Sequence, residues 1–255
     1  MSAKVRINRY LAAAGFGSRR KCEELIRQGL VSVNGCAVDA LARMVETETD
    51  VIAVGGRAVS SVEAARVLVL KKPIGVLCTV SDSFRRRTVI DIARECGYTE
   101  RLFPVGRLDL NTSGILILTN DGDLAYRLTH PRFKIEKTYR VVIAGTITEE
   151  TVGRISAGID LNGQATRPCA ITVDARGDQT TTLTVVLGEG RKRQIRRMFA
   201  RFGHKVIELE RTAIGDLKFA DLAPGSMRPL SGREENRLRE LAGLAREGKE
   251  KPVCQ

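Results

Sequence analysis

The sequence contains no tryptophan and few aromatic residues of any kind. Aromatic side chains make up 4% of the 255 residues, whereas hydrophobic residues make up 43% and charged residues 28%. The core must therefore be built mainly from valine, leucine, isoleucine and alanine, and the composition is that of a globular protein. This length predicts one large domain or two smaller ones.

The chain also lacks the residue patterns of metal and disulfide sites. Its histidines are His130 and His204, and none of its six cysteines forms a C-x-x-C pair, which argues against a structural zinc site. Deaminase zinc signatures, P-loops and G-x-S-x-G nucleophile elbows are missing too. We therefore expect reduced thiols, no metal, and chemistry that depends on a carboxylate without a cofactor.

Long apolar segments are missing as well. No run approaches the ~20 residues of a membrane-spanning helix, and the first ten residues, MSAKVRINRY, contain no apolar signal core. We expect a cytoplasmic protein. Positive charge is in excess, because 42 lysines and arginines oppose 30 aspartates and glutamates and give a net charge of +12. The expected partner is a polyanion, with nucleic acid favoured over an anionic membrane.

Turn residues and periodicity divide the chain into a small N-terminal part, a large middle part and a charged tail. The spacing predicts helices over residues 5–15 and 18–29, the second capped by Ser18, and an Asn34-Gly35 hairpin turn. A second hairpin is expected over residues 50–59. We place the boundary near residues 60–65, and the three predicted parts are 1–62, 66–232 and 233–255.

The middle part alternates between strand and helix patterns. Strands are predicted within residues 66–80, with an interruption at Lys72-Pro73, and at 114–120, 137–145 and 181–190. Helices are predicted at 88–96, 148–158, 193–203 and, in the tail, 233–249.

Basic residues gather in two places. One set lies in the first two predicted helices, and its candidate phosphate contacts are Arg6, Arg9, Arg19, Arg20 and Arg27. Seven more lie between residues 188 and 205, and the candidate contacts there are Arg191, Lys192, Arg193 and Arg197. In the second set, an apolar face of Ile195, Met198, Phe199 and Phe202 predicts a docked helix. The alternatives are a solvated helix face and, for the second set, a membrane-surface helix.

The stretch GRLDLNTSG, residues 106–114, holds the best candidate carboxylate, Asp109. Arg107 lies two positions away and projects to the same side if the segment is extended. A nearby cation would keep Asp109 ionised for use as a nucleophile or base. On local pattern alone, however, a surface turn closed by an Arg–Asp pair is the more common explanation.

Longer segments resemble the pseudouridine synthases that act on ribosomal RNA and carry an N-terminal S-four-type RNA-binding domain. The matching motifs are GRLDLNTSGILILTNDGDLAYRLTHP, KTYRV and EGRKRQIRRMFARFGHKV, and the SRRKCEELIRQG and VSVNG segments resemble the small domain. The resemblance covers nearly the whole chain. It implies an α+β fold, in which a mixed, largely antiparallel sheet is flanked by helices, with a small N-terminal α/β RNA-binding domain.

The resemblance also implies residue roles. By position, Asp109 corresponds to the catalytic aspartate, Tyr139 to the tyrosine that stacks on the target base, and Arg196 to the arginine that pairs with the aspartate. Ile195 lines the uracil pocket, and Arg107 and Leu108 complete the first motif. The implied reaction isomerises uridine to pseudouridine and needs no cofactor.

The implied partner is ribosomal RNA or an assembling ribosomal subunit, bound by a monomer. The KPIGVLCTVSD and GHKVIELERTAIGDL segments look more like the members that act on large-subunit RNA. Small-subunit RNA or tRNA is the alternative substrate. A non-catalytic RNA-binding factor in ribosome assembly is the alternative class, and the presence of Asp109, Tyr139 and Arg196 together argues against it.

Overall fold

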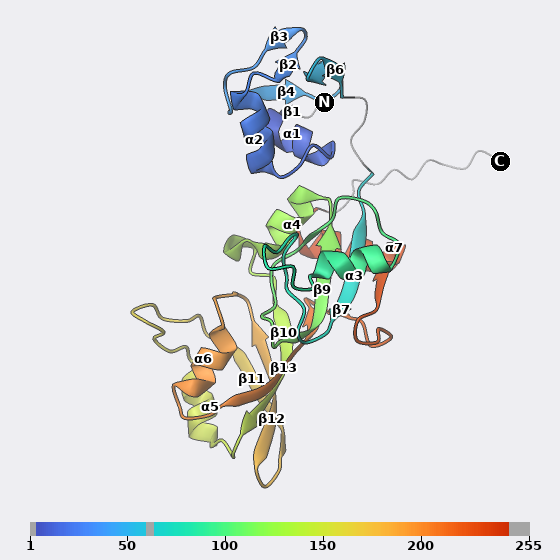
Figure 1. Ribbon diagram of the computed structural model, residues 1–255. Coiled ribbons are helices and arrows are strands. Elements are labelled where there is room, and N and C mark those ends of the chain that lie inside the picture. The colour runs from blue at the N-terminus through green and yellow to red at the C-terminus, as the bar shows by residue number, and fades with distance from the viewer. Residues whose placement is uncertain (1–3, 60–63, 245–255) are drawn as a thin grey trace, which may run out of the picture. The chain divides into compact units, whose positions relative to one another are not determined.

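The computed structural model describes residues 4–59 and 64–244, and the chain divides into two compact units between residues 65 and 66 (Figure 1). None of the described helices combines the length and the apolar character needed to cross a membrane. The described cysteines, Cys22, Cys36, Cys78, Cys96 and Cys169, are thiols that form no disulfide with one another.

The smaller unit packs two helices on a short antiparallel sheet. Its elements are β1 (Lys4–Arg6), α1 (Ile7–Ala13), α2 (Arg19–Arg27), β2 (Val31–Val33), β3 (Cys36–Ala37), β4 (Met44–Glu46), β5 (Ile52–Val54) and β6 (Arg57–Ala58). The strand order is β3-β2-β5-β6, and β1 pairs with β4. Ile7, Leu11, Cys22 and Ile26 of the helices are buried against strand residues such as Val31.

Local sequence signals explain most of this unit. The Ser18 hydroxyl accepts a hydrogen bond from the Lys21 amide and caps α2, as predicted. Asn34 and Gly35 have φ values of 52° and 81°, which suits a tight turn between β2 and β3. One expectation is wrong, because residues 5 and 6 do not begin the first helix. They belong to β1 instead, since pairing with β4 satisfies their backbone groups.

The larger unit is built on one mixed sheet. Its elements are β7 (Val67–Lys72), α3 (Val89–Glu95), β8 (Phe103–Pro104), β9 (Ser113–Thr119), α4 (Gly122–Thr129), a 3-10 helix η1 (Pro131–Phe133), β10 (Lys137–Ala144), α5 (Glu149–Ser156), β11 (Ala170–Arg176), β12 (Thr180–Leu187), α6 (Gln194–Ala200), β13 (Val206–Ile214), β14 (Leu217–Lys218), β15 (Met227–Pro229) and α7 (Gly232–Leu241). The main strand order is β11-β12-β10-β13-β9-β7-β15, with β14 paired to β13 and β8 to β9. Among the described strands, β9 and β13 alone pair in parallel. The predicted α+β fold class is confirmed.

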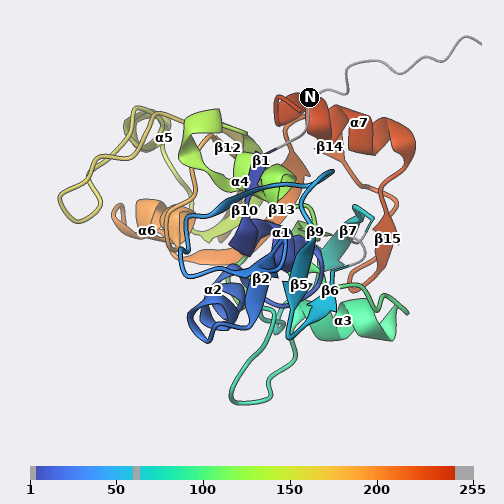
Figure 2. The same ribbon diagram turned by 90° about the horizontal axis from the view of Figure 1, so that it is seen from above.

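Helices cover the two halves of this sheet in different ways. Figures 1 and 2 show α5 and α6 beside β11 and β12, whereas α3, α4 and α7 lie beside β7 and β9. In β7 and β9, alternate residues face opposite layers. Val69 and Ile117 pack with α4 and α7, whereas Leu70 and Leu116 pack with α3. Helices on both faces explain why these strands are almost continuously apolar.

The charged tail contributes to the core of the larger unit. Its helix, α7, begins at a Ser231 capping box and buries Leu238 in the cluster that contains Leu124 and Val69. The helix ends at Leu241, whereas the sequence pattern predicted helix as far as residue 249. Residues 245–249 lie outside the described residues.

The two halves of the sheet meet at Gly114 on β9. Gly114 has a φ of 108°, and a Cβ built on it would lie 2.2 Å from the backbone oxygen of Arg211 on β13. Arg211 in turn donates from Nε to the Ile115 carbonyl oxygen at 2.6 Å. Since any side chain at position 114 would collide with β13, glycine is required for this parallel strand pair.

Candidate active site

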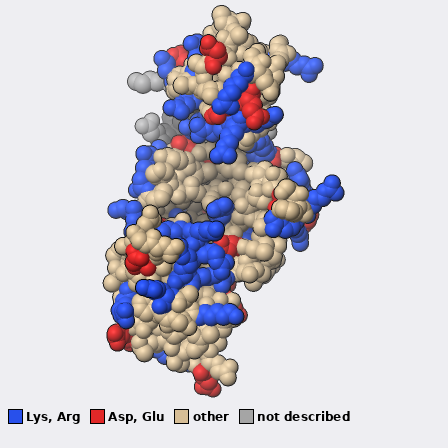
Figure 3. Space-filling model, turned by 60° about the vertical axis from the view of Figure 1, so that its left-hand side comes forward, with Lys and Arg blue, Asp and Glu red and all other residues tan. Residues whose placement is uncertain are grey.

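A cavity of about 630 Å³ opens where the two halves of the sheet meet. Its walls come from the loop after β7, the loop between β8 and β9, strand β10, and the loop between β12 and α6. Five basic residues line it, Arg86, Arg107, Arg191, Lys192 and Arg193, against the acids Asp82, Asp109 and Glu189. Figure 3 shows Lys and Arg side chains gathered on one face of the larger unit.

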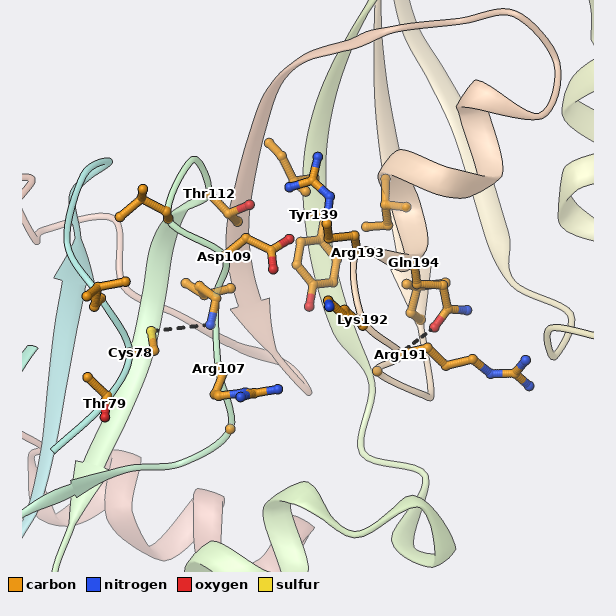
Figure 4. Close-up of a pocket in the computed structure, with 18 of the residues that line it drawn as sticks. Cys78, Thr79, Arg107, Asp109, Thr112, Tyr139, Arg191, Lys192, Arg193 and Gln194 are labelled. Atoms are coloured by element: carbon orange, nitrogen blue, oxygen red, sulfur yellow. Dashed lines mark hydrogen bonds between the residues drawn. The ribbon is translucent and has the colours of Figure 1, made fainter. Parts of the chain in front are cut away.

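Asp109 lies in the loop that leads into β9. Its carbonyl oxygen accepts a hydrogen bond from the Thr112 amide at 3.0 Å, which closes a turn over residues 109–112. The side chain is half-buried and points into the cavity towards Tyr139 (Figure 4). The turn therefore exists, but it presents the carboxylate to a cavity and not to open solvent.

The residues next to Asp109 are fixed by the loop after β7. The Leu108 amide lies 3.3 Å from the Cys78 sulfur, and the Gly75 amide donates to the Leu110 carbonyl oxygen at 2.9 Å. Leu108 is buried, whereas Arg107 is exposed. Arg107 and Asp109 both line the cavity, as expected for alternate residues of an extended segment.

A buried lysine, Lys72, lies close enough to Asp109 for the charge of Asp109 to affect its pKa. Lys72, at the end of β7, is 0% exposed and donates from Nζ to the Pro73 carbonyl oxygen at 2.7 Å. Burial lowers the pKa of Lys72, and the charges of Cys78 and Asp109 oppose that shift. This cation was not anticipated, because a lysine that ends an apolar strand normally reaches solvent.

Tyr139 projects from β10 opposite Asp109. Strand β10 pairs with β12 on one side and β13 on the other, and the β13 pairing shifts register between Thr138 and Tyr139. Such a bulge changes the direction of a side chain at the edge of a site. Figure 4 shows the Tyr139 ring facing Asp109, with Arg193 above it.

The loop between β12 and α6 is held in shape by a buried polar cluster. Gln194 is 4% exposed, donates from Nε2 to Glu189 at 2.7 Å, and accepts from the Arg191 amide at 3.0 Å. The Arg191 guanidinium donates to the carbonyl oxygens of Gln164 and Ala165. Arg191 therefore braces the loop, whereas Lys192 and Arg193 are exposed at the cavity.

The structure places Arg196 differently from the sequence expectation. Among the described residues, no ion pair within 4.0 Å joins it to Asp109. Its guanidinium instead donates to the carbonyl oxygens of Asn111 at 2.6 Å and Val206 at 2.9 Å. These acceptors tie α6 to the turn that carries Asp109, so Arg196 can position the carboxylate without touching it. Burial and the charge of Arg193 lower the pKa of Arg196, and the Asp109 charge opposes them.

The other predicted residues fall into three groups. Ile195 is buried and lines the cavity with Asp109 and Tyr139. Arg197 is half-buried on α6 and is not part of the cavity lining. The five candidate phosphate contacts of the smaller unit are all exposed: Arg6, Arg9, Arg19, Arg20 and Arg27.

Sequence reasoning missed the loop after β7 as part of the site. Thr79, Asp82 and Arg86 line the cavity, and Phe84 is 78% exposed with the Arg86 guanidinium over its ring. The KPIGVLCTVSD segment was noted only for its resemblance. The available signal was the run Phe84-Arg85-Arg86-Arg87, an aromatic residue followed by three cations. In the described part of the chain, no group of His, Cys, Asp and Glu could hold a metal ion.

Comparisons with known proteins agree with this geometry. Residues 66–201 match the family model of RNA pseudouridylate synthase, and residues 5–52 match that of the S4 domain. An uncharacterised RNA pseudouridine synthase of Aquifex aeolicus is 40% identical over 94% of this chain and 96% of its own. Ribosomal large subunit pseudouridine synthase B of Bacillus subtilis is 40% identical over 93% and 96%. A crystal structure of a pseudouridylate synthase, 29% identical, superposes with a TM-score of 0.65 over 93% of this chain and 99% of that one.

Proposed function

This chain belongs to the RNA pseudouridylate synthase family, and from that premise we propose that it modifies ribosomal RNA, specifically that of the large subunit. The relatives named ribosomal large subunit pseudouridine synthase B, from Bacillus subtilis and Vibrio cholerae, support the choice of substrate because each is 40% identical over more than nine-tenths of this chain. Small-subunit RNA and tRNA are the alternatives that the test must separate.

The observation that carries the proposal is the position of Asp109. A half-buried carboxylate faces an aromatic ring across a cavity lined by Arg107, Lys192 and Arg193. The aromatic ring suits stacking on a base, the cations suit phosphates, and the carboxylate suits attack on a nucleoside. A surface turn would need none of these groups around it.

The proposed reaction follows from these residues. The target uridine must leave its helix or loop to reach the cavity, and stacking on Tyr139 offsets part of the unstacking cost. Asp109 then attacks the sugar or the base, or removes a sugar proton, so that the bond from nitrogen 1 to the ribose breaks. The uracil turns and rejoins through carbon 5. Carbon 5 loses its proton on joining the ribose and nitrogen 1 gains one, so substrate and product are isomers and atoms and electrons balance.

The surrounding protein keeps the intermediate in place. Leu108 and Ile195 supply buried apolar walls to the cavity, and these limit the water that could reach a detached base. Arg196 holds the turn that carries the carboxylate. We propose a positioning role for Arg196, in place of the direct pairing with Asp109 that the resemblance implies.

The substrate is tested with purified protein and three unmodified transcripts: large-subunit RNA, small-subunit RNA and bulk tRNA. We expect pseudouridine at one or a few positions of the large-subunit transcript and none in the others, measured by reverse-transcription stops after carbodiimide treatment. Modification confined to small-subunit RNA or tRNA would contradict the proposed substrate while leaving the enzyme class intact.

The smaller unit is expected to deliver RNA by binding its phosphates. In the double variant Arg19→Gln/Arg20→Gln, we expect weaker RNA binding and a flatter dependence of log K on log salt. The slope should fall by roughly 0.7–0.9 for each phosphate that the variant no longer neutralises. Both residues are exposed near the start of α2, so the fold should be kept. The exposed Arg57→Gln on β6 is the control for simple loss of charge, and equal effects of the two variants would contradict a specific interaction.

A further inference from the structure

A second, smaller cavity lies next to the first and shares part of its lining. It measures about 140 Å³, and its walls come from the loop before β9, from α4 and η1, and from β10 and β13. Tyr139 and Arg107 line both cavities. This volume is far below the ~300–1,000 Å³ of a typical ligand pocket but several times the ~30 Å³ of a water molecule. It suits a small polar group and not a nucleoside.

Besides the exposed Arg107, two cations line this cavity without an acidic partner. Lys137 donates from Nζ to the carbonyl oxygens of Leu128 at 3.3 Å and Ile135 at 2.5 Å. Arg211 is 4% exposed and donates from Nε to Ile115, while its Nη2 is buried and has no acceptor among the described residues. No carboxylate of the described chain lies within 4.0 Å of either cation.

The one acid in the lining is already engaged elsewhere. Glu189 binds the Gln194 amide, the Arg167 backbone amide and the Arg191 guanidinium. Glu189 therefore stabilises the loop between β12 and α6, and it does not neutralise the positive charges of Lys137 and Arg211. Burial and the nearby Arg211 charge lower the pKa of Lys137 to about 8. The half-buried Lys137 and the buried Arg211 are neighbouring cations that repel each other, and an anion placed between them would remove that cost.

We propose that this second cavity binds a phosphate group, supplied by the RNA backbone beside the target uridine or by free phosphate. Lys137 Nζ donates to its oxygens, the buried Arg211 guanidinium adds positive charge beside them, and the exposed Arg107 also lines the cavity. Because Tyr139 lines both cavities, a base stacked on it would leave its own backbone close to the second one. The backbone source rests on the proposed function, whereas the phosphate chemistry does not.

The first experiment uses inorganic phosphate and the full-length protein. Melting temperature is measured at increasing phosphate and constant ionic strength, with chloride as the reference anion. We expect phosphate to raise the melting temperature of the wild type, because a ligand that binds the folded state stabilises it. Lys137→Gln should lose this rise, and Lys137→Arg should keep it. The exposed Lys218→Gln on β14 is the matched control and should behave as the wild type does.

Two outcomes would overturn the phosphate site. One is the absence of any phosphate-specific rise in the wild type. The other is an equal rise in the wild type and in Lys137→Gln, which would mean that phosphate binds elsewhere. Neither outcome depends on pseudouridine formation, so a failure here is distinct from a failure of the proposed enzyme activity.

The second experiment identifies the source of the phosphate. If the RNA backbone supplies it, Lys137→Gln should bind substrate RNA about 10-fold more weakly, which corresponds to one charge-assisted hydrogen bond of about 1.4 kcal/mol. Inorganic phosphate should also compete with RNA for the wild type. If RNA affinity is the same in both proteins while phosphate still stabilises only the wild type, free phosphate is the ligand. Weakened RNA binding by Lys218→Gln to the same extent would contradict the backbone assignment.

The pH dependence gives an independent check. Lys137 carries its charge below a pKa of about 8 and loses it above, so the phosphate-dependent rise should shrink as pH passes through that value. The other titratable or charged groups lining the cavity are Arg107, His130, Tyr139, Glu189 and Arg211. Lys137→Arg stays charged and should keep the rise up to higher pH. The same loss in both proteins would contradict a titrating Lys137.

Discussion

Replacing Asp109 by asparagine is expected to abolish pseudouridine formation and leave RNA binding nearly unchanged. Asparagine has almost the same volume, but it is neutral and cannot serve as the nucleophile or base that the reaction needs. We expect the single-turnover rate to fall by roughly 1,000-fold or more, about 4 kcal/mol of transition-state stabilisation. RNA affinity should persist, because the residues proposed to bind the phosphates, such as Lys192 and Arg193, are other members of the cavity lining.

The matched control for this change is Asp82→Asn. Asp82 lines the same cavity, but its carboxylate is held by Arg86 and by the amides of the loop after β7. It should keep most of the activity if Asp109 alone performs the chemistry. Pseudouridine formed at near the wild-type rate by Asp109→Asn would remove Asp109 from the mechanism. An equal loss in both variants would indicate a general requirement for negative charge in the cavity.

Gly114→Ala is expected to destabilise the larger unit severely. The added Cβ would lie 2.2 Å from the Arg211 carbonyl oxygen and 2.5 Å from its nitrogen, distances that only a shift of β9 or β13 can relieve. Separating these strands breaks the parallel pair that joins the two halves of the sheet. We expect a loss of about 3 kcal/mol or more in the free energy of unfolding, measured as a shift of the urea midpoint for the larger unit.

Comparison with Gly97→Ala separates the steric collision of the new Cβ from the cost of the left-handed backbone conformation. Gly97 also has a positive φ, 85°, but nothing lies within 4 Å of the position of a new Cβ. Its replacement should cost only ~1 kcal/mol for the left-handed conformation. If Gly114→Ala costs no more than Gly97→Ala, the approach of β9 to β13 is not as tight as described.

Local signals in the sequence were enough for most of the fold. The Ser18 cap, the Asn34-Gly35 turn and the apolar strands β7 and β9 each depend on residues close together in the chain. Strand β1 was missed because its assignment depends on pairing with Met44–Glu46, far along the sequence. Patterns within a segment carry no information about such a partner.

In the candidate site, too, some features could be predicted from the sequence and others depend on contacts between distant segments. The resemblance predicted Asp109 and Tyr139 as site residues, and the structure brings them to one cavity. The hydrogen bonds of Arg196 could not be predicted, because its acceptors are backbone carbonyl oxygens of Asn111 and Val206, and every residue has such an oxygen. Lys137 lies on β10 and Arg211 on β13, and they come together without a carboxylate partner only because these two strands pair in the sheet. The sequence of either strand alone therefore does not predict this pair of cations.

The most direct test of the central claim is pseudouridine mapping of ribosomal RNA from cells that lack this protein. The large-subunit RNA should lose pseudouridine at a defined position, with the small-subunit RNA unchanged. A plasmid that expresses the wild type should restore the modification, and one that expresses Asp109→Asn at the same level should not. An unchanged large-subunit map, or restoration by Asp109→Asn, would contradict the account.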